Sequence, residues 1–149
     1  MSVSRSRTAP STVGYSGKPL WQKLGLKPQL RVRLQHAPPE YWDWCGFDPG
    51  SVTIVSAAAR RVDFAHLFAT SRAELEQDLG KSAKTLDSTG MLWISWPKKS
   101  SGVATDITEG TLRELALPLG LVDVKVCAVT EVWSGLKFVW RVEKRGLRA

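Results

Sequence analysis

Apolar and polar residues alternate with a period of two in three stretches of the chain, at 30–35, 122–128 and 136–142. This pattern predicts strands that bury one face and expose the other. Two further stretches, 63–69 and 91–96, are almost wholly apolar. Such runs are typical of central strands in a parallel sheet that is covered on both faces.

Two longer segments repeat apolar residues every three or four positions, which predicts helices with one buried face. The first begins at Ser71, which forms a predicted capping box with Glu74. The second begins with the same kind of signature, from Asp106 to Glu109, and ends before Pro118. Shorter elements are expected at 19–24 (helix), 38–45 (helix) and 52–55 (strand).

The order of these elements is strand, helix, strand, strand, helix, strand, helix, strand, strand. This order predicts a single α/β domain with a Rossmann-like, open, mostly parallel sheet flanked by helices. Only residues 130–135 join the last two strands, and so short a link forces an antiparallel hairpin. Residues 1–12 hold little that can be buried, so we expect a disordered basic tail followed by one domain over 13–149.

Charge is distributed unevenly along the chain, whose formal net charge is +7. Residues 1–39 contain seven Lys and Arg and no acid, whereas 40–136 contain nine bases and 13 acids. From Lys137 onward there are five bases and one acid. The basic ends form one basic surface only if they fold onto the same side. The partner stays unknown: a small anion or an acidic partner fits. Nucleic acid is less favoured, because the sequence lacks the aromatic–basic interleaving of such modules.

Cysteine and histidine usage gives no indication of a metal site. Cys45 and Cys127 fit no metal-ligand or redox spacing, and the two histidines, His36 and His66, are far apart. No apolar run has the length of a membrane span, and the N-terminus lacks a secretory signal. We therefore expect a cytoplasmic protein with reduced thiols, no metal and no membrane contact.

The loop after the apolar stretch 91–96 is the first candidate site. It carries two lysines and two serines and leads into a predicted helix start, where free amides and the helix dipole favour an anion. The alternative is a solvated loop in which Asp106 already occupies those amides. The loop does not have the spacing of a phosphate-binding P-loop, so nucleotide hydrolysis of that kind is not expected. The candidate anion-binding residues are Lys98, Lys99, Ser100, Ser101 and Thr105.

A glycine-rich turn is missing after the first predicted strand, where a dinucleotide or adenosyl site would have one. The chain has Gln35-His-Ala-Pro-Pro39 at this point. Two prolines and no glycine do not allow the backbone to approach a cofactor closely. We therefore expect no cofactor.

Three residues are candidates for a ligand platform: Trp133, Ser134 and His36. Trp133 is expected in a turn, where its ring either caps the end of the sheet or stacks on a ligand. His36 is expected at the carboxyl end of the first strand. His66 lies inside an apolar strand and is interpreted as a core histidine.

Two long stretches resemble the signatures of an uncharacterised bacterial family of small α/β proteins, known only as a domain of unknown function. They are SWPKKSSGVATDITE (95–109) and VCAVTEVWSGLKFV (126–139). The segments 14–20 and 67–75 also fit, so that the resemblance covers about residues 13–142. The family has no established activity and implies no catalytic residue. This chain departs from the family pattern at Arg33, where the resemblance implies an apolar residue.

More distantly, the segment 86–95 and the closing hairpin are similar to the last part of class I methyltransferase domains. Topology alone does not establish function. Our first hypothesis is a non-catalytic binding or accessory domain, with an anion-binding loop at the carboxyl end of the sheet. The alternative is a methyltransferase-like transferase with a rebuilt cofactor loop. No catalytic residue is assigned under either reading.

Overall fold

The computed structural model describes residues 17–145, which form one six-stranded sheet in the order β2-β1-β3-β4-β6-β5. The first four strands in this order are parallel, and β6 is antiparallel to both of its neighbours. This confirms the predicted open, mostly parallel sheet with a closing hairpin. The strands are β1 (Arg31–Gln35), β2 (Thr53–Ile54), β3 (Val62–Phe68), β4 (Leu86–Pro97), β5 (Leu121–Ala128) and β6 (Trp133–Trp140).

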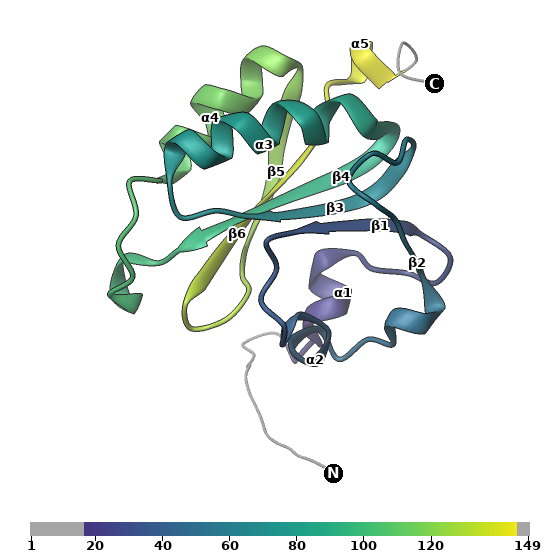
Figure 1. The fold of residues 1–149 in the computed structure, drawn as a ribbon, viewed down its shortest axis with the longest axis horizontal. Helices are drawn as coiled ribbons and strands as arrows, with labels where there is room; N and C mark the ends of the chain where they lie inside the picture. The colour runs from purple at the N-terminus through teal and green to yellow at the C-terminus, as the bar shows by residue number, and fades with distance from the viewer. Residues whose placement is uncertain (1–16, 146–149) are drawn as a thin grey trace.

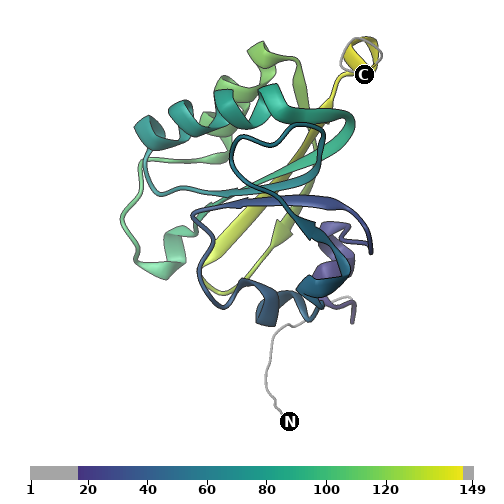
Figure 2. The ribbon, with the colours of Figure 1, turned by 45° about the vertical axis from the view of Figure 1, so that its right-hand side comes forward.

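Helices cover both faces of the sheet (Figure 1). Two helices, α3 and α4, lie on one face, and α1 and α2 lie on the other, as the turned view in Figure 2 also shows. The helices are α1 (Leu20–Leu24), α2 (Tyr41–Cys45), α3 (Arg72–Thr85), α4 (Glu109–Ala116) and α5 (Val142–Arg145). Short 3-10 turns lie at Pro49–Ser51, Lys99–Ser101 and Leu117–Leu119.

The chain changes its direction across the sheet between β1 and β3. From β1 it passes to β2 at the outer edge, and it then crosses back to β3 on the other side of β1. In open α/β sheets, ligands bind outside the carboxyl ends of the strands at such a switch point. Here those ends are Gln35 and Phe68.

Each face of the sheet has its own apolar core. On the α3 and α4 side, Leu75 and Leu112 are buried against strand residues such as Ile94. On the other side, Trp93 is buried, and its indole Nε1 donates a hydrogen bond of 2.8 Å to the carbonyl of Leu24. This bond fixes the end of α1 to the middle of the sheet.

The strand β4 begins five residues before the predicted stretch 91–96. The register shifts between Val62 and Phe64, whose partners in β4 are Leu86 and Met91. Gly90 therefore lies at an irregularity within the strand. A Cβ on Gly90 would lie 2.8 Å from the carbonyl oxygen of Val62, so only glycine fits there.

The strand β5 departs from its predicted pattern. Alternation placed Val124 and Val126 on a buried face, but they are 53% and 56% exposed. The register shifts between Asp123 and Lys125, which indicates a bulge. Because one extra residue exchanges the faces of the following residues, Cys127 packs in the core under α1 and α2.

Arg33 is an interior residue of the sheet, where the family resemblance implied an apolar side chain. It is only 3% exposed, and its guanidinium donates to the carbonyls of Ala57 and Ser82, both at 3.3 Å. Burial lowers the pKa of Arg33. The strand β1, which pairs with β2 and β3, is therefore central although it carries a buried cation.

The predicted tail, residues 1–12, lies outside the described residues. Over residues 17–145 no helix combines the length and the apolar character needed to cross a membrane.

Candidate functional site

His36 meets two carboxylates at the switch point of the sheet. Its Nε2 lies 3.0 Å from an oxygen of Asp78 and 4.0 Å from an oxygen of Glu74. His36 directly follows β1, while both acids lie on α3, the helix that follows β3. The side chains of His36, Glu74 and Asp78 are 53%, 42% and 15% exposed, so the cluster is open to solvent.

The turn that replaces the glycine-rich loop has a glycine-like backbone at His36. Its φ is 58°, in the left-handed region that L residues rarely adopt. The chain thus leaves β1 through a tight turn before α2, and Gln35 accepts a hydrogen bond from the Ser82 hydroxyl of α3. Pro38 and Pro39 offer no N–H, so this loop cannot cradle a ligand with backbone amides as a glycine-rich loop does.

These three residues are also a possible cation-binding set. One ligand atom from each of His36, Glu74 and Asp78 lies within 4.8 Å of the others. Imidazole and carboxylate groups bind divalent transition metals. The sequence led us to expect no metal site, because the two histidines are far apart, and that expectation remains a prediction. Sequence reasoning missed the two acids, although their spacing of four places them on one face of α3.

The candidate anion loop uses most of its polar groups internally. The Ser101 hydroxyl donates to the Lys98 carbonyl at 2.6 Å and accepts from the Val103 amide. The amides of Ser101 and Gly102 donate to carbonyls within the same turn. Of the predicted residues, Lys99 and Ser100 are exposed and Lys98 is half-buried. The anion site stays a prediction, now with few free amides to support it.

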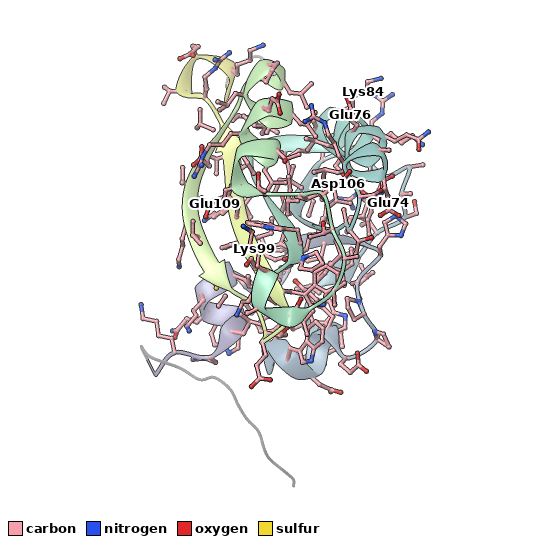
Figure 3. The ribbon with its side chains drawn as sticks, turned by 90° about the vertical axis from the view of Figure 1, so that its left-hand side faces the viewer. Glu74, Glu76, Lys84, Lys99, Asp106 and Glu109 are labelled. Carbon is pink, nitrogen blue, oxygen red and sulfur yellow. The ribbon has the colours of Figure 1, made fainter. Side chains whose placement is uncertain are left out.

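Thr105 and Asp106 connect this loop to α3. The Thr105 hydroxyl donates to the Thr70 carbonyl at 2.6 Å, and the Asp106 carboxylate accepts from the Arg72 amide at 2.7 Å. Figure 3 shows Asp106 and Glu74 on the side of the molecule where α3 begins. The predicted helix start at Asp106 is wrong: the cap of α4 is Thr108, which forms a capping box with Thr111.

Only half of the capping box predicted for α3 is confirmed. The Ser71 hydroxyl accepts a hydrogen bond from the Glu74 amide. The Glu74 carboxylate approaches His36 instead of returning to the cap. The first turn of α3 is therefore completed by Asp106, and Glu74 is left at the switch point.

Trp133 is the first residue of β6 and does not lie in a turn as predicted. It pairs with Pro97, and its half-buried ring meets Phe68 edge-on with centroids 5.0 Å apart. Ser134 lies within the sheet, paired with Trp96 and Ala128. Trp133 packs with the core under α1 and α2, whereas His36 contacts α3 on the other face. The structure therefore does not bring the predicted platform residues together.

His66 is a core histidine, as interpreted from its apolar strand. Its Nδ1 and Nε2 lie 2.8 Å from the Tyr41 hydroxyl and 2.7 Å from the Ser95 hydroxyl. Burial lowers the pKa of His66 to about 3, so the ring is neutral. Because His66 and Ser95 are at most 1% exposed, this serine–histidine pair cannot reach a substrate and instead ties α2 to the sheet.

A hollow of about 630 Å³ lies at the opposite end of the sheet, where α3 ends and β4 begins. Arg60, Arg61 and Lys84 contribute positive charge to its lining, and Asp87 contributes negative charge. It lies away from the switch point, and none of the residues predicted as candidates lines it.

No protein-family model matches the chain, and no curated protein sequence matches it. Solved structures do match. Magnesium protoporphyrin IX methyltransferase of Synechocystis PCC 6803 with bound SAH matches with a TM-score of 0.56 at 12% identity, over 89% of this chain and 90% of that one. A TehB-like SAM-dependent methyltransferase of Corynebacterium glutamicum matches with a TM-score of 0.50 at 10% identity, over 81% and 85%.

This chain has the Rossmann-like fold of these methyltransferases. A pericyclic reaction enzyme also matches, with a TM-score of 0.51 at 14% identity, although this chain spans only 39% of its length. At such identities the likeness concerns the fold alone. The distant similarity suspected from the segment 86–95 is thereby confirmed for the fold, whereas the signatures of the bacterial family remain a prediction.

Proposed function

We propose that this chain is a methyltransferase-like transferase domain that holds an adenosyl ligand through a rebuilt loop after β1. The observation that carries the proposal is the cluster of His36, Glu74 and Asp78 at the switch point of the sheet. The same fold holds SAH in the methyltransferase that matches over 89% of this chain. We also propose that the protein is cytoplasmic, as expected from the sequence.

The residues of the cluster fit part of such a ligand. Carboxylates accept hydrogen bonds from ribose hydroxyls, which is their usual role at the ribose of nucleotide cofactors. S-adenosylmethionine also carries a positive sulfonium, which the charges of Glu74 and Asp78 favour. The same charges disfavour a diphosphate, so a dinucleotide fits this edge less well. What the chain lacks is a cradle of amides, because Pro38 and Pro39 stand where glycines would.

A second candidate, a non-catalytic binding domain, is supported by the occupied helix start. Asp106 already accepts a hydrogen bond from the Arg72 amide at the first turn of α3. In addition, the residues that follow β2 are Val55, Ser56 and Ala57, and none of them is an acid. A nucleotide-binding domain of this kind usually has an acidic residue there to bind the ribose hydroxyls. Under this reading the fold is kept, while the switch point serves a different ligand or partner.

Calorimetry and thermal unfolding with S-adenosylmethionine and S-adenosylhomocysteine separate the two functions. An adenosyl ligand at ~100 times its dissociation constant is expected to add about 2.7 kcal/mol to the free energy of unfolding. Asp78→Asn and Glu74→Gln should weaken binding, whereas Glu76→Gln, an exposed acid on the same helix, should not. Conversion of bound S-adenosylmethionine into S-adenosylhomocysteine with an acceptor would then establish transfer. No shift with either compound supports the binding domain instead.

A further inference from the structure

Two lysines face each other across the closing hairpin. Lys125 of β5 and Lys137 of β6 are directly paired in the register of the sheet. Their side chains point toward the α1 side, because the Lys125 ammonium donates a hydrogen bond of 3.0 Å to the carbonyl of Lys23. Like charges directly opposite each other destabilise a strand pair. The pairing follows from the bulge after Asp123, which brings Lys125 to this face.

Three more lysines lie near the closing hairpin. Lys23 and Lys98, with Lys125, lie close enough to Cys127 that their charges oppose the rise in its pKa that burial causes. The pKa of Lys137 is lowered first by burial and then by the charges of Lys125 and Lys27. We call these five residues the lysine face: Lys23, Lys27, Lys98, Lys125 and Lys137.

The lysine face is not neutralised by the chain itself. Within residues 17–145, none of its five members forms an ion pair with a carboxylate. The basic surface expected from the two basic ends of the sequence is a different one and stays a prediction, because Lys98 and Lys125 belong to the middle of the chain. A group of like charges without counter-charges favours an anionic partner.

An aromatic ring lies along the same face. Trp133 is four residues before Lys137 on β6, so both side chains point to the same side, about 13 Å apart along the strand. Lys98 is held beside Trp133 by a hydrogen bond of 2.7 Å from its amide to the Val132 carbonyl. The fold therefore places one aromatic ring, that of Trp133, beside the basic residues of this face.

We propose that the lysine face binds single-stranded nucleic acid without sequence preference, with its ammonium groups on the phosphates and Trp133 beside the bases. All five members are lysines, which contact phosphate as point charges. The partly exposed ring of Trp133 beside Lys98 favours a nucleic acid over an acidic polypeptide, because bases stack on aromatic rings and acidic side chains do not. The proposal is independent of the adenosyl site, which lies under α3 on the other face of the sheet.

Fluorescence anisotropy of the full chain with a labelled oligothymidylate tests the proposal. If all five lysines contact phosphates, affinity should fall about 100-fold between ~50 and ~200 mM salt. The pair Lys125→Gln with Lys137→Gln should reduce that fall to about 20-fold and weaken binding at low salt. The control, Lys81→Gln with Lys84→Gln on α3, removes the same charge and should behave as the unaltered chain.

Three outcomes would overturn the proposal: no binding at low salt, equal losses in the test and control pairs, or equal binding of polyglutamate of matched charge. The last would identify an acidic polypeptide as the partner. A second pair, Lys27→Gln with Lys98→Gln, repeats the test should the first pair fail to fold.

Discussion

Asp106 caps a helix that begins 34 residues before it in the chain: its carboxylate accepts a hydrogen bond of 2.7 Å from the backbone amide of Arg72, the first residue of α3. The bond joins the loop after β4 to the helix after β3. It also places a negative charge at the positive end of α3, which is the favourable arrangement for a helix dipole.

Replacing Asp106 should therefore destabilise α3 and leave α4 intact. Asp106→Ala is expected to lower the free energy of unfolding by about 1 kcal/mol, as for the loss of a helix cap. Hydrogen exchange should become faster at the Arg72 amide and unchanged in the first turn of α4. The control Thr108→Ala removes the cap of α4 and should have the reverse local effect. Faster exchange in α4 after Asp106→Ala would contradict this assignment.

His66 should make the fold sensitive to acid. Its pKa is lowered to about 3 in the folded state by burial, while an unfolded histidine has a pKa of 6.5. Below pH ~6.5 the unfolded chain binds a proton at His66 that the folded chain does not bind. The contribution of His66 to the free energy of unfolding is therefore largest above that pH and falls as the pH drops toward ~3. The loss from this residue by pH ~5 is about 2 kcal/mol.

Denaturant unfolding at several pH values checks this effect. His66→Gln should remove the extra slope between pH ~6.5 and ~5, whereas His36→Gln, at an exposed position, should retain it. An unchanged slope in His66→Gln would show that other groups cause the acid sensitivity.

Trp133→Ala should have an intermediate effect on stability. The ring is half-buried and contacts Phe68 edge-on, at a centroid distance of 5.0 Å. A fully buried aromatic would be worth ~3 kcal/mol or more, and an exposed one well under ~1 kcal/mol. We expect Trp133→Ala to lower the free energy of unfolding by about 2 kcal/mol, measured by denaturant unfolding, and Trp133→Phe to lower it less. A near-neutral result would mean that the ring is free to stack on a ligand.

Local patterns in the sequence were sufficient for most of the fold. Alternation predicted β1, the cap at Ser71 predicted the start of α3, and the short link after Ala128 predicted the antiparallel hairpin. These features depend on residues close together in the chain, where steric and hydrogen-bonding preferences act directly.

The candidate site could not be predicted in the same way, because it depends on contacts between distant residues. His36 and Asp78 are 42 residues apart and meet only because β1 and β3 pair. The bulge in β5 likewise has no local signature, yet it decides which face Lys125 and Cys127 occupy. Sequence reasoning therefore found one member of the cluster, His36, and missed both acids.

Lys137 should destabilise the folded chain at neutral pH, and replacing it should stabilise the chain. Its pKa is lowered by burial and by the charges of Lys125 and Lys27, so the folded state holds this proton less tightly than the unfolded state does. As the pH rises through the lowered pKa toward ~10.5, the unfolded chain keeps its proton longer, and stability should increase. Lys137→Gln should raise the unfolding midpoint at pH ~7 and abolish this alkaline increase, measured as the difference from the unaltered chain.

Lys99→Gln, at an exposed position outside the lysine face, serves as the matched control and should change neither quantity. A lower midpoint for Lys137→Gln at neutral pH would show that the side chain contributes more through its packing in the hairpin than it loses through like-charge repulsion.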